Sequence, residues 1–153
     1  MRVGKAEVWD EVAKQTAYIG DKTAQSAESA DGADMYDTVL LTDADAGDLE
    51  RFWEEAAAVA DGHLREMLQG RSVPGAYYEA NLRMSDGYDS GLNVAAERAL
   101  RGYFVAALAA RWCRLAIPAK AEEYEREAAQ MMTHVLTMLY SRKRPVRADK
   151  VRN

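Results

Sequence analysis

The chain has 153 residues, of which 48% are hydrophobic and 29% are charged, with ten glycines, three prolines and one cysteine. This composition excludes collagen-like, mostly disordered and disulfide-rich proteins, and the length suits one domain with a sizeable core. The main apolar run, residues 102–110, is far shorter than the ~20 residues that a membrane helix needs. With Cys113 as the sole cysteine and acidic residues near the start, the sequence predicts a cytoplasmic protein without a leader or membrane span.

Charge is unevenly distributed along the chain, although the net charge is only −5. Residues 28–61 hold eleven acids against one base, Arg51, whereas residues 142–153 hold six bases against Asp149. One interpretation is a solvated acidic face and a solubilising basic tail. The other is that the two poles attract each other, within one chain or between neighbouring subunits, because opposite charge steers association.

The first predicted element is a helix over residues 5–19. Apolar side chains from Val8 to Ile19 recur at helical spacing, and Gly20 is expected to end the helix in a left-handed conformation. The residues that follow are small or polar and offer almost nothing large to bury. They predict a flexible linker over residues 20–35.

A second helix is predicted over residues 43–69. Thr42 and Asp45 have the spacing of a capping box, with Asp in place of the usual Glu. An apolar stripe follows at helical spacing as far as Leu68, and Gly70 is expected to supply the C-terminal stop.

Residues 77–84 alternate strictly between apolar and polar positions, with Tyr78 and Met84 on the apolar side. The pattern predicts a strand with one solvated face. A strand needs a partner for its backbone groups, and residues 37–41 are a weak candidate. We therefore expect the strand to pair with that segment or with a neighbouring subunit.

Two long helices are predicted over residues 92–117 and 119–142. The first is apolar nearly all round in its middle, which is typical of a central helix packed on several sides. Pro118 suits the start of the second helix, and Pro145 lies just beyond its end.

Together these elements predict a mainly α fold, a four-helix bundle-like single domain over residues 1–145 with a short β-strand or hairpin. A basic disordered tail is expected over residues 146–153. The predicted core consists of Trp53, Ala56, Leu64, Leu100, Phe104, Leu108, Trp112, Met132, Val135 and Leu139.

No motif predicts a catalytic, metal or cofactor site. A calcium-loop count from Asp43 fails, because its sixth position must be Gly and is Asp48. His63 and His134 lack the spacing of zinc ligands, and Cys113 has no second cysteine. The sequence has no phosphate-binding glycine loop and no nucleophile elbow. We therefore expect a non-enzymatic protein that uses neither a metal nor a cofactor.

A basic run follows the last predicted helix, from Arg142 to Arg147, and favours contact with nucleic acid. No aromatic residue interrupts this run to stack on bases, and the acidic remainder of the chain would repel DNA. A nucleic-acid-binding or host-interaction module that uses this segment remains the alternative function.

Five stretches, residues 11–20, 49–56, 78–84, 121–128 and 140–145, together resemble small uncharacterised proteins of phage or prophage structural-gene regions. The helical layout is similar to that of head-tail connector or adaptor proteins of tailed phages. The resemblance implies a structural subunit that forms rings with copies of itself or contacts other virion neck proteins. Such a protein would lie in the host cytoplasm before assembly and in the virion afterwards.

The expected interface combines the strand, the acidic helix and the basic segment. It comprises Tyr77, Tyr78, Leu82, Asp43, Asp48, Glu54, Glu55, Arg142, Lys143, Arg144 and Arg147.

Overall fold

The structure is a computed structural model that describes residues 1–26, 45–70 and 75–143. It is mainly helical with a small two-stranded antiparallel sheet, which confirms the predicted fold class. In chain order the elements are β1 (Arg2–Gly4), α1 (Lys5–Ser26), α3 (Ala46–Leu64), β2 (Tyr77–Glu79), the short 3₁₀ helix η2 (Ser90–Leu92), α4 (Asn93–Ala116) and α5 (Pro118–Leu139).

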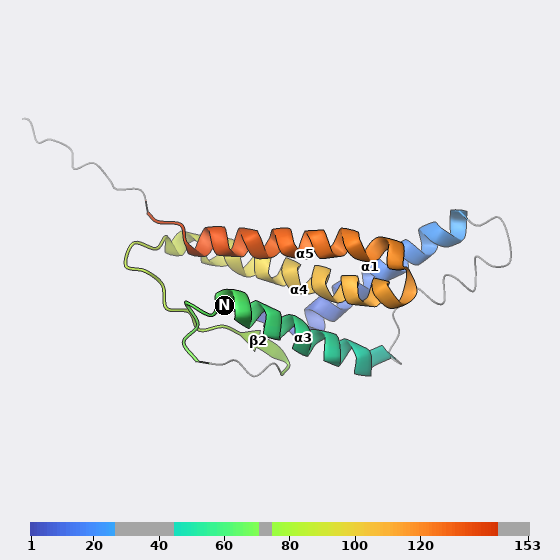
Figure 1. Cartoon of the computed structure of the whole chain (residues 1–153), viewed down its shortest axis with the longest axis horizontal. Helices are drawn as coiled ribbons and strands as arrows, with labels where there is room; N and C mark the ends of the chain where they lie inside the picture. The colour runs from blue at the N-terminus through green and yellow to red at the C-terminus, as the bar shows by residue number, and fades with distance from the viewer. Residues whose placement is uncertain (27–44, 71–74, 144–153) are drawn as a thin grey trace, which may run out of the picture.

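The helices α4 and α5 form a long antiparallel hairpin (Figure 1). They are joined by Ile117 alone, whose backbone nitrogen donates to the Cys113 carbonyl at 2.7 Å and closes the last turn of α4. Pro118 begins α5 as predicted, because the first helical position needs no backbone N–H. Gly102 permits close packing between the two helices, since a β-carbon there would lie 3.2 Å from the Met131 sulfur.

The middle of α4 is the centre of the core, as its apolar composition predicted. All residues from Tyr103 to Ala110 are buried, because α1, α3, α5 and β1 pack around this helix. The ring of Phe104 lies 4.6 Å from that of Trp53 and 4.9 Å from that of Tyr78, measured between centroids. All ten predicted core residues are buried.

The strand prediction is confirmed in its alternation and wrong in its partner and length. Every even position from Tyr78 to Met84 is buried or half-buried, and every odd position from Tyr77 to Arg83 is exposed. Within the described residues the partner is β1, in the register Val3↔Tyr78, whereas the predicted partner, residues 37–41, lies outside them. A three-residue strand is too short to show a period of its own, so the sequence did not reveal it.

Beyond β2 the chain pairs on its opposite edge with the segment that follows α3. Gln69 donates to the Asn81 carbonyl at 2.8 Å, and the Arg83 nitrogen donates to the Met67 carbonyl at 2.7 Å. This pairing corrects the predicted end of the second helix, because α3 stops at Leu64 and the next residues turn into the bridge. Gly70 adopts a φ of 94° after this bridge and does not cap the helix.

Two other boundaries differ from prediction. The helix α1 continues through Gly20 to Ser26, because one glycine costs only about 1 kcal/mol relative to alanine and no proline follows it. The predicted linker is therefore wrong for residues 20–26, and the remainder of it lies outside the described residues. The helix α3 begins at Ala46, and Asp45 precedes it without a side-chain capping hydrogen bond.

The last helix ends at Leu139, earlier than predicted. The next residues join the loop before α4, since Lys143 donates to the Gly87 carbonyl at 2.9 Å and Arg142 forms a bridge with Tyr88. Residues 144–153, which include the predicted tail, lie outside the described residues.

Candidate docking groove

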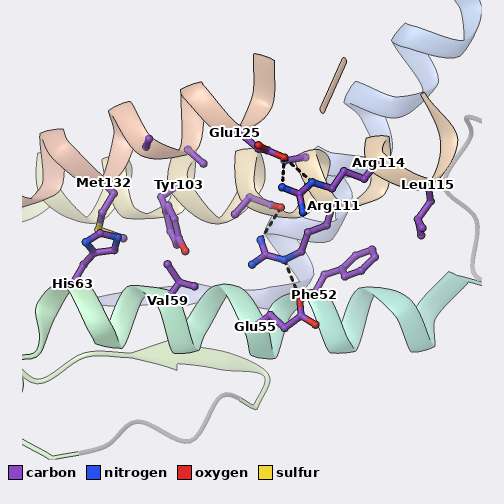
Figure 2. A pocket seen from close by; sticks show the side chains of 14 residues that line it. Phe52, Glu55, Val59, His63, Tyr103, Arg111, Arg114, Leu115, Glu125 and Met132 are labelled. Atoms are coloured by element: carbon purple, nitrogen blue, oxygen red, sulfur yellow. Dashed lines mark hydrogen bonds and ion pairs between the residues drawn. The ribbon is translucent and has the colours of Figure 1, made fainter. Parts of the chain in front are cut away.

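A groove runs between α3 and α5 above α4 (Figure 2). The helices α3 and α5 run in the same direction, and α4 runs opposite to both, as the placement of their labelled side chains shows. The groove has a volume of about 510 Å³. Its lining consists of Phe52, Glu55, Val59, His63, Tyr103, Ala107, Ala110, Arg111, Arg114, Leu115, Glu125, Ala128, Ala129 and Met132.

The lining of the groove contains four alanines, at positions 107, 110, 128 and 129. Alanine side chains are too short to fill the space between neighbouring helices. Larger apolar residues form the sides of the groove, and two of them face solvent, with Val59 45% exposed and Leu115 61% exposed. Exposed apolar groups in a concave site favour contact with another apolar surface.

Two ion pairs join the last turns of α4 to α3 and α5. Arg111 Nε donates to Glu55 Oε2 at 3.0 Å, and Arg111 Nη1 also donates to the Ala107 carbonyl at 3.1 Å. Arg114 donates to Glu125 Oε1 at 2.6 Å. These four charges sum to zero, and the pairs are partly exposed, so each contributes little to stability.

Tyr103 fixes the position of α3 relative to α4. Its hydroxyl donates to the Ala56 carbonyl at 3.0 Å, a buried hydrogen bond between the two helices. Burial raises the pKa of Tyr103 to about 12, which keeps this donor protonated at neutral pH. At the His63 end of the groove, the Tyr140 hydroxyl donates to Glu66 at 3.2 Å and links the residues that follow the two flanking helices.

The strand residues predicted for the interface are distributed between core and surface. Tyr78 is fully buried, and its hydroxyl donates to Asp61 at 2.9 Å, so in this structure it lies in the core and not on an accessible interface. Leu82 is half-buried and packs against the core. Tyr77 is 46% exposed, with the Arg2 guanidinium 3.6 Å from its ring centroid. Because β2 is paired with β1, it does not need a strand from another subunit.

The acidic residues predicted for the interface mostly have partners in their own chain. Asp48 pairs with Arg51 at 2.9 Å, and Glu55 pairs with Arg111. Glu54 is exposed on α3, and Asp43 lies outside the described residues. The acidic pole on the described part of α3 is therefore smaller than the sequence charge implies.

The basic residues lie at the opposite end of the molecule from the first turn of α3 (Figure 1). Arg142 and Lys143 are exposed and held by the loop at residues 87–89, whereas Arg144 and Arg147 lie outside the described residues. The predicted interface combined residues of the strand, the acidic helix and the basic segment. In the described part of the chain, these three groups lie in three separate regions.

Of the groove lining, the predicted interface included only Glu55, and sequence reasoning missed Val59 and Leu115. Val59 and Leu115 lie outside the apolar stripes that face the core, so their side chains are exposed. An apolar residue outside such a stripe can indicate a binding surface, and this pattern was visible in the sequence. The spacing of Arg111 and Arg114 also places both side chains on one face of α4. The packing of this face against α3 and α5 depends on the tertiary arrangement. No local sequence pattern predicts it.

The described residues also bear on metal and membrane functions. Among them, no group of three or more His, Cys, Asp or Glu side chains is close enough together to hold a metal ion. No helix within residues 1–26, 45–70 and 75–143 is both long and apolar enough to cross a membrane. Cys113 is buried, and burial raises the pKa of its thiol, which disfavours the reactive thiolate.

No protein-family model matches this chain, and neither the comparison with curated proteins nor that with solved structures found a match.

Proposed function

We propose that the chain is a non-enzymatic structural subunit of a phage or prophage particle, of the head-tail connector or adaptor kind. In this proposal it assembles through protein contacts, first in the host cytoplasm and then in the virion. The groove between α3 and α5 is the docking surface. The observation that carries the proposal is the pair of exposed apolar residues, Val59 and Leu115, in a concave site that three helices surround.

Three helices around an apolar groove leave the position of a fourth helix open. Recognition of an amphipathic helix in such a groove is a recurrent mode of protein docking. The predicted partner is another copy of the chain, because the resemblance to connector proteins implies ring formation. A groove on one subunit that accepts a different surface of the next gives a head-to-tail contact, which closes into a ring when the rotation permits.

Light scattering after size-exclusion chromatography of the full chain tests this proposal. We expect self-association that rises with protein concentration and is reduced at least tenfold in Val59→Glu, since a buried carboxylate without a partner is costly. Val94→Glu is the matched control, because Val94 is exposed on α4 away from the groove. A full chain that stays monomeric at high concentration, or equal loss in both variants, would contradict docking of copies through this groove.

A further inference from the structure

We infer that the end of the molecule where α3 and α5 finish binds the phosphate backbone of a nucleic acid. The site, which we call the basic end, consists of four exposed bases: Arg65, Arg83, Arg142 and Lys143. None of the four lines the groove, so this inference is independent of the proposed function.

Backbone hydrogen bonds bring the four bases to one end of the molecule (Figure 1). The segment after α3 pairs with the segment after β2, since the Arg83 nitrogen donates to the Met67 carbonyl at 2.7 Å. The segment after α5 pairs with the loop before α4, since the Lys143 nitrogen donates to the Gly87 carbonyl at 2.9 Å. The hydroxyl of Tyr140 joins the two pairs through its hydrogen bond to the segment after α3. Bases that are far apart in the sequence therefore lie in one connected region.

The loop before α4 holds Arg142 in position. Arg142 forms a β-bridge with Tyr88. A β-carbon at Gly87 would lie 3.7 Å from Cγ and Cδ of Arg142, so the stem of the arginine lies against this glycine. The stem packs on the loop while the side chain as a whole is exposed. Because the backbone and the stem are already ordered, binding of an anion costs this arginine less conformational entropy.

The bases of the basic end have no carboxylate partner among the residues that the structure describes. Two further bases in the described part of the chain, Arg98 and Arg126, also lack such a partner and lie within α4 and α5. The bases that do pair with carboxylates are Arg2, Lys5, Lys14, Arg51, Arg101, Arg111, Arg114 and Lys120. Unpaired positive charge is thus concentrated at the basic end, where it is available to an external anion.

The acids in the same segments do not cancel this charge. Two of them, Glu66 and Asp89, accept hydrogen bonds within the chain, and Asp86 is the third. The sequence that follows Lys143 adds four bases against one acid in residues 144–153. The bases thus outnumber the acids, although the whole chain has a net charge of −5. Such a local excess orients a polyanion toward this end of the molecule.

A nucleic acid suits the basic end better than the acidic face of α3 in a second copy. The acids of that face are engaged in their own chain, since Asp48, Glu50 and Glu55 are each paired with a base. Tyr140 is 57% exposed and lies two residues before Arg142, which gives a nucleotide base a ring to stack on. Three of the four bases are arginines, whose planar N–H donors match phosphate oxygens.

Fluorescence anisotropy of labelled oligonucleotides with the full chain tests the inference. The probes are a single strand of about 20 nucleotides, longer than the site of one small domain, and the duplex of the same mixed sequence. We expect at least one probe to bind, with an affinity that falls as the salt concentration rises, because phosphate contacts release counterions. A chain that binds neither probe at about 0.05 M salt would overturn the inference.

Single variants of the full chain locate the contact. Arg83→Gln and Arg142→Gln should each weaken binding about four- to sixfold at about 0.15 M salt and lower the salt slope by about 0.7–0.9, the loss of one phosphate contact. Arg142→Lys retains the charge and should retain the salt slope. Arg126→Gln is the matched control, because it removes an exposed base without a carboxylate partner in the described chain, far along α5 from the basic end. Equal weakening by Arg126→Gln would show that net charge alone governs binding and would overturn the site.

A labelled polyglutamate of the same charge as the single strand separates a nucleic acid from an acidic protein segment. We expect it to bind about tenfold more weakly than the better oligonucleotide, because it has no base to stack on Tyr140. Equal affinity would overturn the nucleic acid as the partner and indicate an acidic segment of a protein. Circular dichroism of each variant checks that the helix content is unchanged, so that lost binding reports the altered side chain.

Discussion

Phe104 is the residue around which the core is organised. Its ring contacts those of Trp53, Tyr78 and Tyr103, which come from α3, β2 and α4 itself. Aromatic pairs at these distances stabilise a core beyond their buried area. One side chain thus holds together elements that lie far apart in the sequence.

Phe104→Ala should lower the free energy of unfolding by ~3–5 kcal/mol, because it removes a fully buried ring and leaves a cavity. Urea unfolding followed by circular dichroism measures this change. Val94→Ala, at an exposed position of the same helix, should change the same quantity by less than about 0.5 kcal/mol. A similar small loss for Phe104→Ala would show that the ring is not in the core.

Buried tyrosines make the stability sensitive to alkaline pH. The pKa of Tyr103 is about 12, and desolvation together with the hydrogen bond to Asp61 raises the pKa of Tyr78 still further. An unfolded tyrosine ionises near pH 10. Between about pH 10 and 12 the unfolded state therefore loses protons that the folded state retains, and stability falls as pH rises.

Below about pH 9, we expect these tyrosines to cause no change in the free energy of unfolding with pH. Above about pH 9, their ionisation in the unfolded state should make the free energy of unfolding decrease. Tyr103→Phe should lower stability at every pH, because it loses the bond to Ala56, but should flatten the alkaline decrease. Urea unfolding at a series of pH values measures both effects. An unchanged slope in the variant would mean that Tyr103 is accessible in the folded state.

At the scale of elements, the sequence predicted what depends on local periodicity. The stripes of α4 and α5 and the alternation from Tyr77 to Met84 were visible because they repeat over several turns or residues. The boundaries at Gly20 and Gly70 were wrong, because a glycine permits a helix end without requiring one. The strand β1 was not predictable, since its stability comes from pairing with residues that follow more than seventy positions later.

The groove was less predictable than the fold. Its lining comes from three helices, and no single helix shows a pattern for it beyond the exposed Val59 and Leu115. The predicted interface relied on an unpaired strand and on total charge. The structure weakens both arguments, because Lys5, Arg51 and Arg111 pair with acidic residues of the same chain and β1 pairs the strand.

Gly62 lowers the stability of α3 without a packing role. No atom lies within 4 Å of where its β-carbon would be, and the residue is helical. Gly62→Ala should therefore raise the free energy of unfolding by about 0.5 kcal/mol. Gly102→Ala is the contrast, since its β-carbon would press on Met131 and offset the same gain. Thermal unfolding of both variants measures the difference, and a destabilised Gly62→Ala would contradict the open space at that position.

At the scale of the whole molecule, the apolar groove and the basic residues after α5 lie in different places. The groove lies along the side of the bundle, whereas Arg142 and Lys143 lie at the end where α5 finishes (Figure 1). A partner that fills the groove need not touch the basic end. In the proposed function the two surfaces serve separate contacts, with the groove supplying affinity and the basic end influencing the rate of encounter.

The single-residue connection at Ile117 has a consequence for the order of folding. The contacts between α4 and α5 join residues that are close in sequence, so forming the hairpin closes only short loops. The β1–β2 pair, by contrast, must bring together segments separated by more than seventy residues. Since local contacts form faster than distant ones, the hairpin is expected to be the folding nucleus and the sheet to assemble on it late. A nascent chain would then acquire its central structure only after α5 has been synthesised.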